Sequence, residues 1–218
     1  MSIIFIDTET TGIPKMKNYK FPDYKDLEAF ENARALQISW VVMKDGQIVS
    51  DNNFVIKPDG FTAVTNSHVH GITYEKAMTE GHDIKDVLKI LREDMWEYST
   101  FADGKKSLPV VVAHNIDFDM AILRSEIWRA RDPETITINL DMYVATHIFY
   151  CTMKKATKPG EKWPTLINLH TRYFKEAPKV SHDALADCYA CLRCFWFQQM
   201  NTDINQKIQR EQAELKCY

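Results

Sequence analysis

The sequence lacks any apolar run close to the ~20 residues that a membrane-spanning helix needs, so a protein built from spanning helices is excluded. It also lacks internal repeats and low-complexity tracts. Residues 1–7 (MSIIFID) have no basic region before a short apolar run that ends on acid, so we expect no signal peptide. Hydrophobic residues make up 45% and charged residues 26%, which excludes disordered and collagen-like classes.

Paired cysteines and an excess of positive charge are also missing. The five cysteines are an odd number, which favours a reduced, cytoplasmic protein. The formal net charge of −3 argues against a protein that holds nucleic acid by bulk positive charge. An enzyme whose acidic residues are offset by metal ions remains compatible with it. The length of 218 residues suits one domain with a full core.

Apolar patterning predicts strands and helices in one α/β domain. The expected strands are Ile3–Asp7, Leu36–Met43, Gln47–Lys57 and Leu108–Ala113, and the expected helices are Asp83–Tyr98, Phe118–Ala130, a short one opened by Pro164, and His182 to about Met200. Lys44-Asp45-Gly46 is a good hairpin turn. Pro14–Ala35 has the features of a surface excursion, and Cys151–Trp163 those of a basic loop. We therefore expect a mixed α/β layer fold over residues 1–200 and a polar helical tail over 201–218.

The first motif, Asp7-Thr8-Glu9-Thr10-Thr11-Gly12, directly follows the first strand. Alternate strand residues share a face, so Asp7 and Glu9 point the same way with Cα atoms about 6–7 Å apart. Two adjacent carboxylates repel, and one would take up a proton unless a cation lay between them. A hard divalent cation with oxygen ligands fits this pair, although a strand end that runs into a polar turn would look the same.

The second motif, His114-Asn115-Ile116-Asp117-Phe118-Asp119, joins a strand to a helix, which is where sites gather in layered α/β folds. Asp119 is expected in the first helical turn. Asp117 is a rival, because residues two apart on a helix point to nearly opposite sides. Asn115 or Asp117 can also serve simply as helix caps.

The third motif, Ser181-His182-Asp183-Ala184-Leu185-Ala186-Asp187, opens the last long helix. Five helical positions amount to about 140° of rotation, so His182 and Asp187 cannot both face one site from within a regular helix. We therefore expect His182 in the loop before the helix, where a histidine suits a general base. Asp183 and Asp187 can also form a solvated helix face.

A metal site at Cys188-x-x-Cys191-x-x-Cys194 is a weaker hypothesis. The three cysteines lie in one continuous predicted helix, and a spacing of three cannot wrap them around a tetrahedral ion. We predict that they are small buried core residues.

Taken together, the three motifs resemble the DEDDh-type 3′–5′ exonucleases, whose members include proofreading exonuclease subunits, RNase T and oligoribonuclease. The family pattern Asp-x-Glu-Thr-Thr-Gly is matched in full, His-Asn-x-x-Phe-Asp is matched from His114 to Asp119, and His followed five residues later by Asp is matched by His182 and Asp187. The resemblance runs from Ile3 to about Phe197 and favours Asp119 over Asp117. It also favours Asp187 over Asp183, and it implies an RNase H-like mixed sheet flanked by helices.

The resemblance implies a two-metal hydrolysis that yields nucleoside 5′-monophosphates. The cofactor is then two Mg²⁺ ions, with Mn²⁺ as an alternative. The implied metal ligands are Asp7, Glu9, Asp119 and Asp187, with Asp7 bridging both ions. His182 is the implied general base.

Further residues are implied to bind the substrate, a nucleic-acid 3′ end, with single-stranded DNA favoured over RNA. These are Thr10, Thr11, Gly12, Ile13, His70 and Trp163. Backbone N–H groups around Thr10 and Thr11 would hold the terminal hydroxyl, and Ile13 would wedge beside the last base. His70 and Trp163 would stack on it or flank it, although Trp163 fits a lid on the core equally well. Two alternatives remain: a catalytically silent nucleic-acid-binding module and a proofreading subunit bound to a polymerase.

Overall fold

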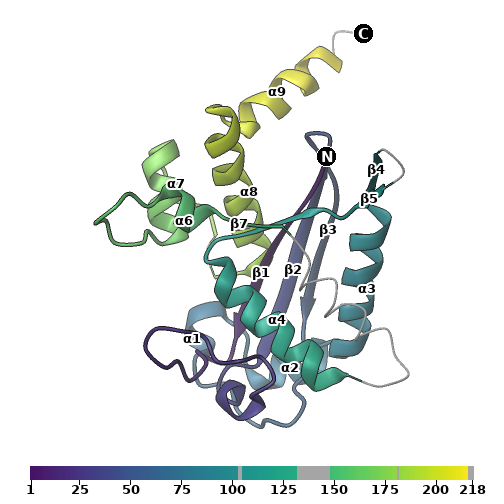
Figure 1. Cartoon of the computed structure of the whole chain (residues 1–218), viewed down its shortest axis with the longest axis vertical. Coiled ribbons are helices and arrows are strands. Elements are labelled where there is room, and N and C mark those ends of the chain that lie inside the picture. Colours follow the sequence, from purple (N-terminus) through teal and green to yellow (C-terminus); the bar gives the residue numbers. More distant parts are fainter. Residues whose placement is uncertain (103–104, 132–147, 181, 216–218) are drawn as a thin grey trace.

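The computed structural model describes residues 1–102, 105–131, 148–180 and 182–215. Within these ranges a five-stranded sheet has the order β3-β2-β1-β6-β7 (Figure 1). The strands are β1 (Ser2–Thr10), β2 (Ala35–Lys44), β3 (Gln47–Val55), β6 (Val110–Ala113) and β7 (Phe149–Cys151). The first three are antiparallel, whereas β6 and β7 run parallel to β1. The predicted mixed α/β fold in a single domain is confirmed.

Helices cover both faces of this sheet (Figure 1). They are η1 (Leu27–Phe30), α1 (Ser67–His70), α2 (Tyr74–Glu80), α3 (Ile84–Glu97), α4 (Ile116–Ala130), α6 (Thr152–Ala156), α7 (Leu166–Phe174), α8 (Ala184–Met200) and α9 (Ile204–Leu215). A separate small hairpin is formed by β4 (Thr100–Ala102) and β5 (Lys105–Ser107). None of the helices in the described ranges is long and apolar enough to cross a membrane.

The central strand β1 is buried on both faces, which explains why its sequence is a continuous apolar run. Ile4 and Ile6 pack in the core shared with α3 and α4. Ile3 and Phe5 pack in a second core under α8. Because side chains alternate along a strand, Asp7 continues the face that α8 covers. The polar end of β1 is thereby placed next to the beginning of α8.

Several predicted boundaries shift because local hydrogen bonds decide where a helix begins. Helix α7 begins at Leu166 and not at Pro164, since the Thr165 side chain accepts the backbone N–H of Asn168 at 3.2 Å. Helix α8 begins at Ala184 and not at His182. The predicted basic loop from Cys151 is partly helical, because α6 occupies its first half.

The interpretation of Pro14–Ala35 as a surface excursion is wrong for its second half. Ala29, Phe30 and Ala33 are buried in the core beside α4, and Phe30 is fully buried. Helical and strand periodicity cannot reveal this burial, because it arises from packing against a helix far along the chain.

The four cysteines within the described ranges are buried and free: Cys151, Cys188, Cys191 and Cys194. The last three lie along α8, as predicted, and the Cys188 thiol donates to the Ser39 carbonyl at 3.3 Å. None of the three belongs to a group of possible metal ligands in the described part of the chain. The prediction that they are core residues is confirmed, and Cys217 lies outside the described residues.

Helix α9 projects away from the sheet at the end of α8 (Figure 1). Its beginning is nonetheless held firmly, because Ile204 is buried and Arg193 of α8 pairs with Asp203 at 2.6 Å. The predicted tail is therefore helical from Ile204 to Leu215, and the beginning of this helix packs against the domain.

Candidate active site

Four carboxylates converge where β1 ends and where α4 and α8 begin. Asp7 and Glu9 are on β1, while Asp119 and Asp187 each lie in the first turn of their helix. Asp7 interacts electrostatically with the other three. The structure therefore brings together all four acids predicted from the motifs, from segments that are up to 180 residues apart (187 − 7).

Asp119 is held in place by the residue between the two β1 acids. Its Oδ1 atom accepts the Thr8 backbone N–H at 3.1 Å and the Thr8 hydroxyl at 2.9 Å, and its side chain is only 2% exposed. Asp117 instead points outward and pairs with Lys154 at 2.5 Å. Asp119 therefore lies with the clustered acids, whereas Asp117 does not. Asn115 adopts a left-handed conformation before α4 and forms no side-chain cap, so the capping alternative is wrong for it.

His182 lies in the loop before α8, as predicted, with a positive φ of 60°. Its backbone N–H donates to Asp187 Oδ2 at 3.2 Å. Possible ligand atoms of Glu9, His182 and Asp187 all lie within 4.8 Å of one another. The left-handed turn thus allows the imidazole and the Asp187 carboxylate to face one place, which a regular helix would prevent.

A hydrogen-bond network centred on Gln37, a residue outside the three motifs, fixes the start of α8. The Gln37 side chain on β2 donates to Asp183 Oδ2 at 3.1 Å and accepts the Ala184 backbone N–H at 3.1 Å. Asp183 Oδ1 in turn caps the helix by accepting the Ala186 N–H at 3.0 Å. Both oxygens of Asp183 are therefore used in positioning, which leaves Asp187 as the acid that faces the site.

Burial and mutual repulsion raise the pKa values of the clustered acids. Burial, followed by the charges of Asp119, Asp187 and Glu9, raises the pKa of Asp7 well above its ordinary value. Burial and the charges of Asp187 and Asp183 raise the pKa of Glu9 to about 7. Burial raises the pKa of Asp119 to about 8, although the Thr8 hydrogen bonds act in the opposite direction.

This cluster fits divalent metal ions. Within the described residues, every group that shifts the pKa of Asp7 or Glu9 through its charge is another carboxylate, and only the charge of His182 acts in the opposite direction, on Asp187. Carboxylate oxygens are the ligands that Mg²⁺ prefers, and a bound cation would remove the reason for protonation. Asp7, Glu9, Asp119 and Asp187 are the residues that would hold such ions.

Among the predicted substrate residues, Ile13 and Trp163 present exposed apolar surface at 65% and 60%. The exposure of Trp163 does not fit a lid on the core. Thr11 departs from expectation, because its backbone N–H donates to the Arg34 carbonyl at 2.9 Å and is not available to a terminal hydroxyl. The Thr10 hydroxyl donates to the Gly12 carbonyl at 2.6 Å and shapes the turn after β1.

His70 is half-buried at the end of α1. Its Nδ1 atom accepts the Ile72 backbone N–H at 3.2 Å, so the proton of the neutral ring is on Nε2. Burial and the nearby charge of His182 lower the pKa of His70. The ring is therefore a neutral group close to the proposed base.

His114, the first residue of the second motif, has a structural role. Its Nδ1 lies 3.0 Å from the Thr152 hydroxyl, and its Nε2 lies 3.0 Å from the Pro164 carbonyl. The ring thereby ties the segment that carries Trp163 to the end of β6. Burial lowers the pKa of His114, which favours the neutral ring.

Solved structures of exonucleases share this fold. Exonuclease X in complex with 5′ overhanging duplex DNA matches with a TM-score of 0.53 and 22% identity, over 94% of this chain and 96% of that chain. E. coli Exonuclease I in complex with a dT13 oligonucleotide matches with a TM-score of 0.60 and 16% identity, over 96% of this chain and 43% of that chain. This chain therefore spans less than half of the Exonuclease I chain.

A search of curated protein sequences gave no significant match. The sequence model of the family described as Exonuclease (RNase_T) matches residues 4–195, which is most of the chain and includes all four clustered acids. Together with the fold and the carboxylate cluster, this match shows that the chain belongs to the RNase_T exonuclease family.

Proposed function

We propose that the protein is a metal-dependent 3′–5′ exonuclease that releases nucleoside 5′-monophosphates. The observation that carries this proposal is the convergence of Asp7, Glu9, Asp119 and Asp187 with His182 beside them. Such a cluster repels a phosphodiester unless cations are bound, and it is unfavourable for stability alone. It is suited to phosphodiester hydrolysis with two ions.

Each residue of the cluster is proposed to have a separate role in metal binding or proton transfer. Bound divalent ions supply the positive charge that lets the phosphate approach four carboxylates, and they lower the pKa of water. Asp7 interacts with all the other acids and would hold both ions. Glu9 and Asp187 lie close to His182, whose imidazole would accept a proton from the attacking water. Asp119, fixed by Thr8, would complete the set of ligands.

The terminal nucleotide would lie against the exposed side chains around the acids. Ile13 would wedge beside the last base, and Trp163 and His70 would flank it; the exposed side chains of Ile13 and Trp163 support this assignment. Backbone polar groups of the turn at Thr10 and Gly12 would contact the terminal sugar. Single-stranded DNA is the favoured substrate, since the similar exonuclease structures contain an oligonucleotide or an overhanging duplex.

The test is degradation of 5′-labelled single-stranded DNA and of its RNA counterpart, with Mg²⁺ and with EDTA. The wild type should shorten the labelled strand progressively from its 3′ end only when Mg²⁺ is present. Asp7→Ala, Asp119→Asn and His182→Ala should each abolish this shortening. Asp117→Asn is the matched control, because it neutralises an acid of the same helical turn that faces solvent.

Cleavage that survives loss of Asp7 would contradict the proposed mechanism. Absence of cleavage in the wild type, together with tight oligonucleotide binding, would favour a silent binding module with the same fold. Shortening from the 5′ end would contradict the proposed direction.

A further inference from the structure

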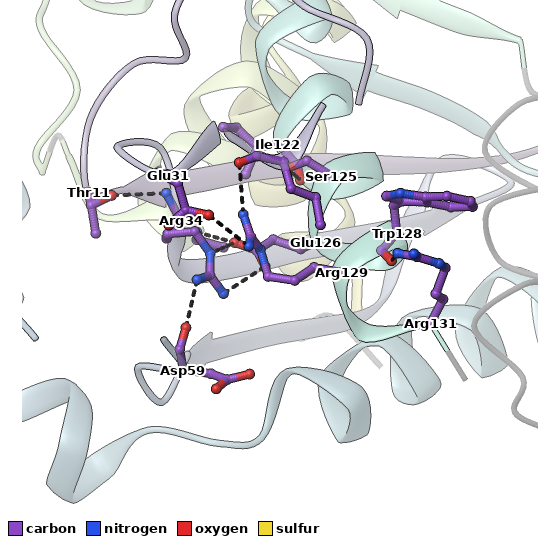
Figure 2. A network of polar contacts seen from close by, with 12 residues as sticks. Thr11, Glu31, Arg34, Asp59, Ile122, Ser125, Glu126, Trp128, Arg129 and Arg131 are labelled. Atoms are coloured by element: carbon purple, nitrogen blue, oxygen red, sulfur yellow. Dashed lines mark hydrogen bonds and ion pairs between the residues drawn. The ribbon is translucent and has the colours of Figure 1, made fainter. Parts of the chain in front are cut away.

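The segment between β1 and β2 is closed at its base and fixed to the helix that carries Asp119. The Thr11 N–H donates to the Arg34 carbonyl at 2.9 Å, and the Arg34 N–H donates to the Thr11 hydroxyl at 2.9 Å. The Arg34 guanidinium contacts both carboxylate oxygens of Glu126 on α4, at 2.8 and 3.2 Å (Figure 2). Both ends of the segment 12–33 are therefore fixed by these hydrogen bonds.

The tip of this segment is a two-residue hairpin. Lys17 and Lys20 exchange backbone hydrogen bonds at 3.2 and 3.0 Å, and the turn residues Asn18 and Tyr19 have φ values of 51° and 59°. A turn with two positive φ angles favours Asn followed by Gly. Tyrosine at the second position is strained, and the Tyr19 side chain is 98% exposed.

Three lysines lie in the hairpin or just before it. Lys17 and Lys20 are directly opposite each other, so their side chains share one face, and Lys15 lies two residues earlier in the chain. Like charges in opposite positions destabilise a hairpin. Neither Lys17 nor Lys20 forms an ion pair with any residue in the described ranges, and Lys15 has only a long contact of 3.8 Å with exposed Glu28.

Acidic residues lie near the hairpin, because Asp23, Asp26 and Glu28 line the same surface hollow as the three lysines, and two of these acids also bind the backbone. Asp23 accepts the Lys25 N–H at 2.9 Å, and Asp26 caps η1 through the Ala29 N–H at 3.4 Å. The hairpin thus combines a strained turn, two opposed lysines and the exposed Tyr19 ring. None of these three features stabilises the hairpin itself.

The hairpin stands at the rim of the carboxylate site. It begins at Lys17, four positions after Ile13, and its end is anchored by the Phe21 ring, which packs edge-on against Phe118 at 6.2 Å. Phe118 immediately precedes Asp119. Figure 1 shows the segment as the purple loop beside the polar end of β1. A strand whose 3′ end lies among the acids would leave the site past this rim.

We propose that Lys15–Lys20 is a nucleic-acid-binding arm for the single-stranded segment behind the 3′-terminal nucleotide. Its lysines contact backbone phosphates, and Tyr19 stacks on a base. The polyanion neutralises the repulsion between the opposed lysines. This inference rests on the proposed function for the placement of the 3′ end, and it assigns the arm to binding and not to bond cleavage.

The charge test compares Lys17→Gln/Lys20→Gln with Lys85→Gln/Lys89→Gln, which removes the same charge from exposed positions on α3. On a long single-stranded oligonucleotide, the arm variant should raise KM about tenfold and lower the slope of log KM against log salt by about 1.4. The control should change neither. Hydrolysis of the p-nitrophenyl ester of thymidine 5′-monophosphate, which is too short to reach the arm, should be unchanged in both variants.

The turn test uses Tyr19→Gly, which removes the ring and relieves the strain. It should raise Tm by about 2–4 °C and still weaken oligonucleotide binding. A variant that is more stable and binds less tightly cannot be explained by damage to the fold. A lower Tm, or unchanged binding, would contradict the role of Tyr19.

Affinity measured by fluorescence anisotropy in an Asp7→Asn background separates the arm from the chemistry. If Lys15–Lys20 binds nucleic acid, the Lys17→Gln/Lys20→Gln change raises Kd about tenfold in the Asp7→Asn background. This result is expected even if the wild type cleaves nothing, and in that case only the proposed function fails. Unchanged Kd and KM in the lysine variant would overturn the arm. The proposal would also be overturned if the Lys85→Gln/Lys89→Gln control weakened oligonucleotide binding equally, or if the arm variant lost activity equally on the p-nitrophenyl ester.

Discussion

Gln37 and Asp183, which are 146 residues apart, share a partly buried hydrogen bond that ties the start of α8 to the cross-strand partner of Glu9. Gln37 is the cross-strand partner of Glu9, and its side-chain carbonyl oxygen also accepts the first backbone N–H of the helix at Ala184. Its amide also donates to Asn53 at 2.7 Å. Because His182 directly precedes this contact, Gln37 positions the proposed base without touching the substrate.

Gln37→Leu is therefore expected to lower kcat more than it raises KM. The substitution leaves the Ala184 N–H without its acceptor and releases the Asp183 side chain, so His182 and Asp187 lose their alignment. Misplacement of a catalytic group by about 1 Å lowers rates roughly a hundredfold. Steady-state kinetics on single-stranded DNA, with Tm measured in parallel, checks this prediction.

The control exchanges the two partners. In the double variant Gln37→Glu/Asp183→Asn, the carboxylate introduced at position 37 accepts from the side-chain amide introduced at position 183 and from the Ala184 N–H. Asparagine also remains a good helix cap. Activity should recover relative to either single variant. A double variant no better than the worse single one would show that the hydrogen bond between these residues does not govern the alignment.

The contrast between Asp7 and Gln37 shows which site residues can be predicted from sequence patterns and which cannot. The carboxylates of the first motif were predictable because they continue a strand whose alternation and apolar run are local properties. Gln37 was not, since its role depends on the register of β1 with β2 and on contact with a helix far along the chain. The burial of Phe30 was hidden for the same reason. The left-handed turn at His182 could be predicted in outline, because helical geometry alone excludes His182 and Asp187 from facing one site.

Without divalent ions, the stability of the protein should fall as pH rises from about 4 to 8, that is, from the unfolded-state to the folded-state pKa values of the clustered acids. The folded-state pKa is about 7 for Glu9 and about 8 for Asp119, both above the ordinary values. A raised pKa means that the protonated acid stabilises the folded state, and this contribution disappears as pH passes through the folded-state value. Tm measured in EDTA across this range should decrease steadily. Mg²⁺ should flatten the decrease, because the ions favour the charged carboxylates, and a pH-independent Tm in EDTA would contradict the repulsion.

Asp119→Asn should make the metal-free protein more stable at pH 8 while abolishing cleavage. The amide keeps an oxygen that accepts the Thr8 N–H and hydroxyl, but it removes a buried charge next to Asp7. A shift of one pKa unit corresponds to about 1.4 kcal/mol, so a Tm increase of several degrees is expected. Asp117→Asn, whose exposed carboxylate pairs with Lys154, should leave both Tm and activity close to those of the wild type.

Glu126→Gln should destabilise the protein far more than Glu31→Gln, although both remove an acid that pairs with an arginine. Glu126 is 3% exposed and accepts from Arg34 and from the Ala35 N–H at 3.0 Å, so its neutralisation leaves the buried Arg34 charge uncompensated (Figure 2).

Breaking a buried pair from one side typically costs about 3–5 kcal/mol, whereas the partly exposed contact of Glu31 with Arg129 contributes at most about 1 kcal/mol. Chemical unfolding of the two variants, both measured in EDTA, gives the comparison. Because Arg34 also closes the base of the 12–33 segment on Thr11, Glu126→Gln should expose that segment to proteolysis before the rest of the domain unfolds. Equal unfolding free energies in the two variants would show that the segment is held mainly by its apolar contacts with α4.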